Sequence, residues 1–538
     1  LTVRNGFETI ISNQQVVANQ LEELEIALEE NQDSHFTIVF LPDDNQHITN
    51  DQEIVENFSV TMRSYQGEEG DLYVSPEGTA DGDGTRNNPL DLDTAITFVQ
   101  KGQKIIVQEG RYVRDKALVI EKYNDGTEEA RKYLIADPKA NERPVIDFDK
   151  QSEGVVHSGN YWHVKGIDFA RSAGNTKGYT IGGNHNIIEN VATYEHGDTG
   201  LQISRTDQSD KIEDRPSHNL VLNSISFDNR DPSENNADGF AAKLTVGEGN
   251  IFRGAVAHNN IDDGWDLYTK LGTGAIGAVV IEYSIAYNNG FLTDGTDGAG
   301  DKNGFKLGGE GIYVPHVIKN SVAFGNGAYG FTSNSNPGVI AENNFAFNNK
   351  KGNLDWSTYR TITEDFVLDG FISFHTEENQ PSDTFPNRLQ ADSNFLYDGA
   401  IPTNESGALL PNKMMELLRE IENVDRDEDG QIIWGDVWDK YEEFMSEYTY
   451  NEDPTDPTDP TDPIEPIDPE EQTDPIDPTD PKEPTDPTDL IEPTDLDDLE
   501  DKIGDERDKK ETSKEENTLP ETSTNNYNLL LLGIVVLS

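Results

Sequence analysis

A repeat of 22 to 26 residues constrains the fold more than any other feature of the sequence. Each repeat combines short runs of β-branched residues with a turn in which a glycine precedes an aromatic or aliphatic residue. These glycines are Gly178, Gly200, Gly239, Gly264, Gly304 and Gly330. Their spacings of 22, 39, 25, 40 and 26 residues indicate that two repeats carry about 15 extra residues. A period of this length, built from short strands, is typical of a solenoid.

A second column of residues decides between the kinds of solenoid. Two positions after an aromatic residue or histidine, successive repeats read His196, Asn229, Asn260, Asn289, Asn326 and Asn349. A leucine-rich repeat would show a fixed leucine pattern instead. Asparagine side chains can hydrogen-bond to one another at the ~4.8 Å spacing of stacked strands. The sequence therefore predicts an all-β fold, a right-handed parallel β-helix.

The regions beside the repeats suggest boundaries for this domain. Residues 91–100 begin with Asp91, a good helix N-cap, and have helical apolar spacing, so we expect a short cap helix over the first coil. We assign residues 71–400 to the β-helix and 401–448 to a C-terminal cap. Residues 1–70 contain one helix-like stretch, Val16 to Glu30, and stay unassigned, with the end of a preceding domain as one interpretation.

The last 90 residues have a different composition. Residues 449–518 repeat Thr-Asp-Pro, and proline at every third position with repelling carboxylates predicts a disordered, extended stalk. Residues 519–538 begin with a pentapeptide that resembles the sortase recognition motif of Gram-positive surface proteins, although serine replaces the usual glycine: Leu519, Pro520, Glu521, Thr522 and Ser523. We expect a truncated sorting signal, hence a secreted protein attached to cell-wall peptidoglycan through a sortase.

Charge and cysteine content exclude several functions. The formal net charge of −62 opposes binding to nucleic acid, so we expect no nucleic-acid partner. The chain has no cysteine, which excludes thiol catalysis and thiolate zinc sites.

Acidic residues line up when the repeats are placed in register. The position before each anchor glycine contains Asp238 and then Asp263, which follows Asp262, while the second position after the glycine contains Asp266 and then Lys306. Carboxylates converging from neighbouring coils repel one another unless a cation lies between them. Because all these ligands are hard oxygens, they favour Ca²⁺. A solvated acidic turn remains the alternative.

Two further groups of residues suggest binding sites. The segment from Arg205 to Asn236 contains Arg205, Lys211, Arg215 and Arg230, which predict contacts to an anionic polymer, and we assign Lys243 the same role. Pairing with nearby acidic residues is the alternative for the arginines. A second loop resembles an EF-hand and would form a structural calcium site closing the C-terminal end of the solenoid, or a plain acidic turn: Asp425, Asp427, Asp429, Gln431 and Asp436.

Three strings in the repeat region resemble the family nine polysaccharide lyases, calcium-dependent pectate lyases with a parallel β-helix. The strings are Ala237-Asp238-Gly239-Phe240, Asp262-Asp263-Gly264-Trp265-Asp266-Leu267 and Asn303-Gly304-Phe305-Lys306-Leu307. The resemblance covers residues 71–400, about 60% of the chain. It implies that Asp238, Asp262, Asp263 and Asp266 bind Ca²⁺ and that Lys306 is the catalytic base.

The resemblance implies a pectate lyase that cleaves polygalacturonate by β-elimination to 4,5-unsaturated oligogalacturonates. We expect a monomer. Two alternatives stay open. One is a lyase or hydrolase on another uronate polymer, of which the hydrolase would use two carboxylates as acid and base. The other is a surface adhesin that binds glycans without turnover.

Overall fold

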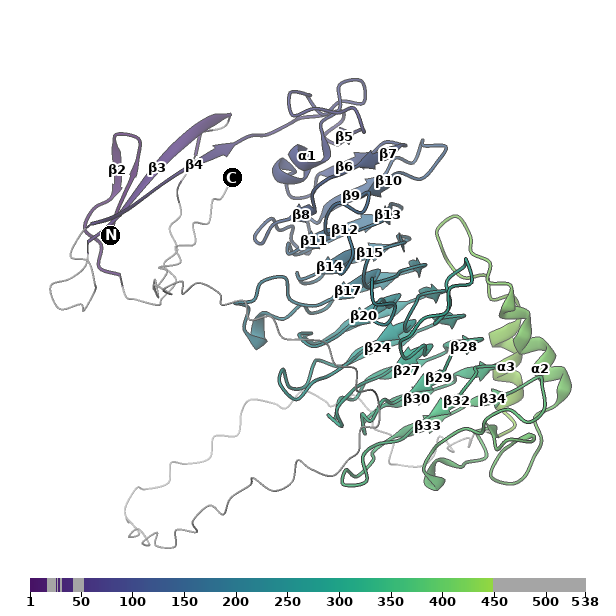
Figure 1. Ribbon diagram of the computed structural model, residues 1–538. Helices are drawn as coiled ribbons and strands as arrows, with labels where there is room; N and C mark the ends of the chain where they lie inside the picture. Colours follow the sequence, from purple (N-terminus) through teal and green to yellow (C-terminus); the bar gives the residue numbers. More distant parts are fainter. Residues whose placement is uncertain (17–25, 27, 30, 42–52, 449–538) are drawn as a thin grey trace, which may run out of the picture. The chain divides into compact units, whose positions relative to one another are not determined.

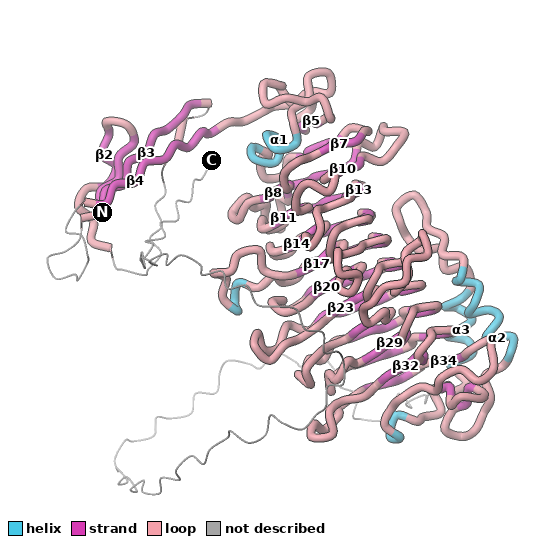
Figure 2. The backbone as a smooth tube through the Cα atoms, viewed as in Figure 1, coloured by secondary structure: helices cyan, strands magenta, loops and turns pink. Residues whose placement is uncertain are grey.

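Most of the described residues form a parallel β-helix (Figure 1). The computed structural model describes residues 1–16, 26, 28–29, 31–41 and 53–448. Each coil contributes one strand to each of three parallel sheets, and we name each sheet after its first strand: the β5 sheet, the β7 sheet and the β8 sheet. Figure 2 shows the strands of successive coils stacked above one another, joined by loops of unequal length. The all-β solenoid predicted from the repeat is confirmed.

The strands are short and nearly equal in length. The β5 sheet contains β5 (Leu72–Val74), β6 (Lys104–Val107), β9 (Lys132–Ala136), β12 (Trp162–Lys165), β15 (Ile187–Glu189), β18 (Leu220–Leu222), β21 (Asn250–Arg253), β24 (Val279–Glu282), β27 (Val317–Lys319), β30 (Ile340–Glu342) and β33 (Val367–Asp369). The β7 sheet contains β7 (Arg111–Val113), β10 (Val145–Asp147), β13 (Asp168–Ala170), β16 (Ala192–Tyr194), β19 (Ile225–Phe227), β22 (Val256–His258), β25 (Ile285–Tyr287), β28 (Val322–Phe324), β31 (Phe345–Phe347) and β34 (Ile372–Phe374). The β8 sheet contains β8 (Leu118–Ile120), β11 (Val155–His157), β14 (Tyr179–Ile181), β17 (Leu201–Ile203), β20 (Phe240–Ala242), β23 (Trp265–Asp266), β26 (Phe305–Lys306), β29 (Tyr329–Thr332) and β32 (Gly352–Asp355).

Identical kinds of side chain stack along the helix axis and fix the register. The asparagine column forms a buried ladder: Asn229 Nδ2 donates to Asn260 Oδ1 at 2.8 Å, and Asn289 Nδ2 donates to Asn326 Oδ1 at 3.0 Å. Inside the coils, the rings of Trp265, Phe305 and Phe331 stack with centroids 4.7 and 4.9 Å apart. In each coil, one ladder pairs a buried asparagine amide and the other buries an aromatic ring. A shift of one coil by one residue would therefore disrupt both ladders.

The N-terminal part contains a cap helix and a separate small sheet. Helix α1 (Leu92–Phe98) begins where Asp91 Oδ1 accepts a hydrogen bond from Thr94 N at 2.8 Å, as its sequence predicts. The first strands form an antiparallel sheet in the order β2-β1-β3-β4: β2 (Glu8–Ile11), β1 (Thr2–Asn5), β3 (Gln32–Phe40) and β4 (Ile54–Met62). The sequence left this segment unassigned, and most of the helix-like stretch from Val16 to Glu30 lies outside the described residues.

The C-terminal cap covers the outer face of the β7 sheet. It contains β36 (Pro402–Thr403), α2 (Asn412–Leu418), η3 (Arg419–Glu422) and α3 (Val437–Met445). Three shorter elements precede it: η1 (Ile212–Asp214), η2 (Asn387–Leu389) and β35 (Leu396–Tyr397). Leu418 and Tyr441 pack against outward-facing Phe345 and Ile372, and Figure 1 shows α2 and α3 beside β28 and β34. The cap therefore covers a side of the solenoid, which corrects the expectation that its EF-hand-like loop closes the C-terminal end.

The stalk and the sorting signal, residues 449–538, lie outside the described residues. Among the residues that the structure describes, no helix is both long and apolar enough to cross a membrane.

Candidate functional site

The four predicted calcium ligands and Lys306 lie on three consecutive coils, at or beside strands of the β8 sheet. Strand β20 pairs with β23 and β23 with β26, which places Ala241 beside Asp266 and Asp266 beside Lys306. Asp238 and Asp263 precede β20 and β23, each directly before an anchor glycine. A Cβ on Gly264 would lie 2.6 Å from Gly304 O, so glycine is required where the coils approach here. The predicted neighbour relations are confirmed.

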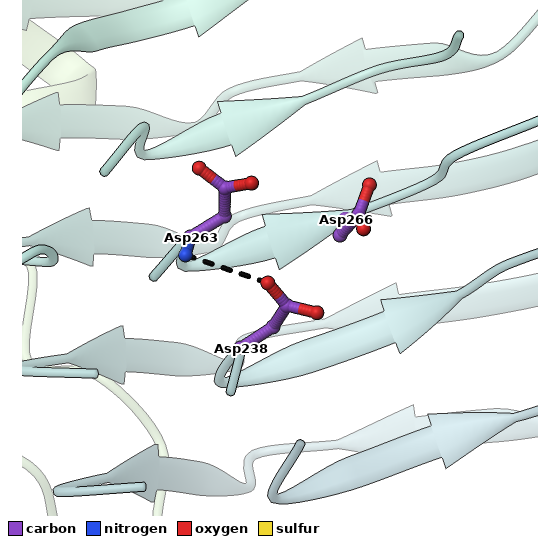
Figure 3. A group of neighbouring side chains, drawn as sticks. All are labelled: Asp238, Asp263 and Asp266. Carbon is purple, nitrogen blue, oxygen red and sulfur yellow. Dashed lines mark hydrogen bonds between the residues drawn. The ribbon is translucent and has the colours of Figure 1, made fainter. Parts of the chain in front are cut away.

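Three carboxylates come together at this point, and we call them the aspartate cluster: Asp238, Asp263 and Asp266 (Figure 3). One oxygen of each lies within 4.8 Å of the others, and all three side chains are buried. Asp263 N donates to Asp238 Oδ1 at 3.4 Å. Asp263 Oδ2 and Asp266 Oδ1 are buried without a hydrogen-bond donor. Converging hard oxygens with unused lone pairs fit Ca²⁺.

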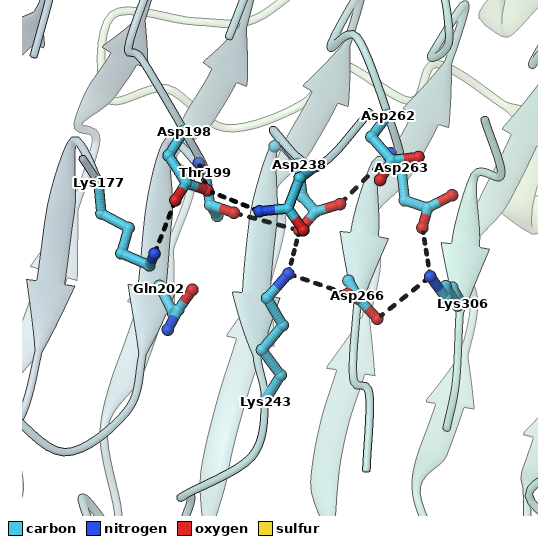
Figure 4. A network of polar contacts seen from close by, with 12 residues as sticks. Lys177, Asp198, Thr199, Gln202, Asp238, Lys243, Asp262, Asp263, Asp266 and Lys306 are labelled. Atoms are coloured by element: carbon cyan, nitrogen blue, oxygen red, sulfur yellow. Dashed lines mark hydrogen bonds and ion pairs between the residues drawn. The ribbon is translucent and has the colours of Figure 1, made fainter. Parts of the chain in front are cut away.

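Two lysines alternate with the aspartates of the cluster (Figure 4). Lys243 Nζ lies 2.7 Å from Asp238 Oδ2 and 3.0 Å from Asp266 Oδ2. Lys306 Nζ lies 3.1 Å from Asp263 Oδ2 without hydrogen-bond geometry, and 3.9 Å from Asp266 Oδ1. Lys243 therefore acts as a counter-charge to the cluster, and it also lines the cleft described below. Its contact with a substrate stays a prediction.

Burial and mutual repulsion perturb the acids of this site. Burial, together with the neighbouring carboxylates, raises the pKa of Asp238 to about 7 and that of Asp262 to about 10. Burial also raises the pKa of Asp263 to about 6, although Lys306 opposes the shift. For Asp266, the penalty of burial is outweighed by Lys243 and Lys306, so its pKa is lowered. Holding every carboxylate ionised here therefore requires additional positive charge.

The pKa of Lys306 is raised, not lowered as a base would need. Burial by itself lowers it, but the carboxylates of Asp263, Asp266 and Asp301 outweigh burial. A lysine base at this position thus depends on a cation that offsets these carboxylates.

Asp262 stands apart from the aspartate cluster. Its Oδ1 accepts hydrogen bonds from the backbone N–H of Asp301 at 2.5 Å and of Lys302 at 3.4 Å. It thereby anchors the loop between β25 and β26 over the site. Of the four acids predicted to bind Ca²⁺, the structure groups three, with Asp262 beside them.

A cleft of about 510 Å³ reaches Lys306 and Asp266 of the aspartate cluster, and Asp262 and Lys243 also line it. Asp301 and Tyr268 line it, and neither was predicted from the sequence. Asp301 Oδ2 lies 2.7 Å from Lys306 Nζ, which lies 5.6 Å from the centre of the Tyr268 ring. Asn303, which directly precedes the anchor glycine Gly304, donates from Nδ2 to Asp263 Oδ1 at 2.9 Å. Both Asp301 and Tyr268 come from segments outside the aligned repeat. Only the repeat indicates which residues of neighbouring coils lie side by side, so the sequence could not place these two.

The three arginines do not line this cleft. Arg215 is buried and donates to Ala275 O and Thr273 O, so it holds loops together. Arg205 donates to Asp210 O at 3.4 Å, and Arg230 pairs with Glu234. Strands β18 and β19 run through the segment from Arg205 to Asn236, which therefore is not one continuous loop and does not gather its cations.

The EF-hand-like loop packs on the turns of the solenoid. Asp427 Oδ1 accepts from Asp429 N and Gln431 N, and Arg426 donates to Asn223 O. Among the described residues, the aspartate cluster is the one place where three acidic or histidine side chains could reach a single ion. The carboxylates of Asp425, Asp427, Asp429 and Asp436 do not converge in this way, and calcium binding by this loop stays a prediction.

Comparisons with known proteins place this site in a family. Pectate lyase L of Thermoclostridium stercorarium is 58% identical over 429 residues, which cover 79% of this chain and 34% of that protein. Pectate lyase L of Paenibacillus polymyxa (strain SC2) is 40% identical over 375 residues, 68% of this chain and 80% of that protein. This chain therefore spans about a third of the length of the first relative and most of the second.

Solved structures and family descriptions agree with these relatives. The crystal structure of pectate lyase Pel9A matches with a TM-score of 0.54 at 28% identity, over 69% of this chain and 88% of that one. Residues 1–60 match the central Ig-like domain of pectate disaccharide-lyase, which accounts for the small N-terminal sheet. Residues 72–367 match the Pel9A-like, right-handed β-helix region. The chain therefore belongs to the Pel9A-like family of right-handed β-helix proteins.

Proposed function

We propose that this chain is a calcium-dependent pectate lyase that cleaves polygalacturonate by β-elimination to 4,5-unsaturated oligogalacturonates. The observation that carries the proposal is the position of Lys306, a potential base, against the aspartate cluster in one cleft. The names of the relatives support it, because proteins 58% and 40% identical are both called pectate lyase L.

The aspartate cluster would hold the ion, with Asp262 beside it. Calcium bound there would supply positive charge next to the C6 carboxylate of a uronate and so make its C5 proton more acidic. Because this strongly acidic protein repels an anionic polymer at long range, binding must rely on short-range contacts in the cleft.

Lys306 would remove the C5 proton. Its Nζ donates to Asp301 Oδ2 at 2.7 Å, so Asp301 orients it, and the charge of Asp263 lies 3.1 Å away. The C–H electron pair forms the double bond between C4 and C5, the C4–O bond breaks, and the departing oxygen takes up a proton. The buried position of Lys306 limits competition from water.

The test is ultraviolet absorbance of the unsaturated product on polygalacturonate, with calcium, with EDTA and with Lys306→Ala. Lys177→Ala is a matched control, because Lys177 pairs with Asp198 at 2.7 Å among the polar contacts of Figure 4 but outside the aspartate cluster. We expect signal from the wild type and the control, and none with EDTA or Lys306→Ala. New reducing ends without absorbance would indicate a hydrolase, and binding without cleavage an adhesin.

We also propose that the protein is secreted and attached to the Gram-positive cell wall. The support is the sequence alone: the Thr-Asp-Pro repeats and the pentapeptide Leu519 to Ser523. Incubation with a sortase and an oligoglycine amine, followed by mass spectrometry, should give a product joined at Thr522. An unchanged mass would contradict the anchor, and Thr522→Ala is the control.

A further inference from the structure

Three tyrosines lie along one edge of the β8 sheet, beginning at the cleft. Tyr268 follows β23 and lines the cleft with Lys306. Tyr313 follows β26 and is 50% exposed, and Tyr359 follows β32 and is 53% exposed. All three come from segments that leave the C-terminal ends of strands of the same sheet, so they share one edge of the solenoid.

Each ring packs closely against a glycine of another coil. A Cβ on Gly309 would lie 2.4 Å from Tyr268 Cδ2, and one on Gly338 would lie 2.6 Å from Tyr313 Cε2. A Cβ on Gly311 would lie 2.8 Å from Tyr359 Cδ2. The rings are thus held against backbone, and those of Tyr313 and Tyr359 keep about half of their surface exposed.

The segments that carry the rings are tied to one another. Gly311 N donates to Ser335 Oγ at 2.9 Å, and Thr358 Oγ1 donates to Ser335 O at 2.7 Å. The hydroxyls of Tyr268 and Tyr313 donate to Glu310 at 3.2 Å and Asp365 at 3.4 Å. These contacts fix the rings in advance, which reduces the entropy lost when a ligand binds.

We propose that Tyr268, Tyr313 and Tyr359 form a binding strip for the sugar rings of the polyuronate chain beyond the cleft. An exposed aromatic ring can bury the apolar C–H face of a sugar without needing positive charge. That matters in a protein with a net charge of −62, where attraction at long range is not available. The strip continues directly from the cleft, because Tyr268 belongs to both. The inference rests on the proposed function, whose substrate it extends.

The test uses Lys306→Ala as the parent, so that oligogalacturonates are not cleaved during titration calorimetry in calcium. We expect Tyr313→Ala with Tyr359→Ala to weaken binding of a hexamer by about tenfold and to leave trimer binding unchanged. Replacing the same residues by Phe, which keeps the rings, should retain most of the affinity. Tyr283→Ala is a matched control, because Tyr283 is 40% exposed on the turn between β24 and β25, at another edge of the coil.

Two results would overturn the strip. One is hexamer binding by the double Ala variant within twofold of the parent, while the wild type cleaves polygalacturonate; the proposed function would then survive alone. The other is equal weakening of trimer and hexamer, which would indicate a general structural defect. If the wild type neither binds nor cleaves polygalacturonate, the proposed function fails as well.

Discussion

Replacing Lys243 with methionine should make the metal-free protein less stable and more responsive to calcium. Oxygens of the aspartate cluster lie within 4.8 Å of one another, so each ionised pair repels by at least about 3.5 kcal/mol at an effective dielectric constant of ~20. Lys243 offsets this repulsion through contacts of 2.7 and 3.0 Å, and its side chain is only 12% exposed. Removing one partner of such a buried network costs about 3–5 kcal/mol.

Thermal unfolding in EDTA and in calcium, at fixed ionic strength, measures both effects. We expect the variant to melt on the order of 5 °C or more below the wild type in EDTA. Calcium at about 100 times its Kd stabilises the wild type by about 2.7 kcal/mol, and it should stabilise the variant by more, because the ion also replaces the lost charge.

The control for Lys243→Met is Lys177→Met, which removes a cation from a single aspartate outside the aspartate cluster. It should leave the calcium-induced shift unchanged. Equal calcium-induced changes in melting temperature for Lys243→Met and wild type would refute the reasoning. They would mean that calcium binding does not depend on the charge of Lys243.

Three further predictions concern pH, the asparagine ladder and the cap. Protons compete with calcium for Asp238 and Asp263, whose pKa values are raised to about 7 and about 6, so the melting difference between calcium and EDTA should grow from pH 5 to pH 8; a constant difference would contradict this. Asn289→Ala removes the donor to Asn326 Oδ1 and the acceptor for Asn260 Nδ2. It should lower the free energy of unfolding, measured by urea titration, by about 3 kcal/mol. The control Asn87→Ala, at an exposed position, should change this free energy little. Deleting residues 404–448 uncovers Phe345 and Ile372, so the product should bind a hydrophobic dye or aggregate, whereas a chain ending at residue 448 should stay soluble and monodisperse.

The fold was predictable because every coil of a solenoid makes the same kinds of hydrogen bonds and packing contacts. Asn260 and Asn289 each make the same hydrogen bonds, so the same residue type recurs at the same interval and the period becomes visible. The same register predicts Asp266 beside Lys306, and the pairing of β23 with β26 confirms it. The N-terminal sheet was not predictable in this way, because strands β1 to β4 occur once and leave no period. Strand β1 pairs with its neighbour β2 and also with the distant β3, where Asn5 lies opposite Phe36.

The sequence by itself determined the coil, its register and the acidic column. An interaction that recurs in every coil requires the same residue type at a fixed interval in the sequence. Only the tertiary structure decided the charge contacts made outside the repeat register. Lys243 pairs with Asp238 and Asp266, and Asp301 reaches Lys306 from a loop outside the repeat. Strands β18 and β19 separate Arg230 from Arg205 and Arg215. Each of the three arginines has partners outside the cleft. Contacts made by irregular loops depend on how each loop folds back in space, and no spacing in the chain encodes that path.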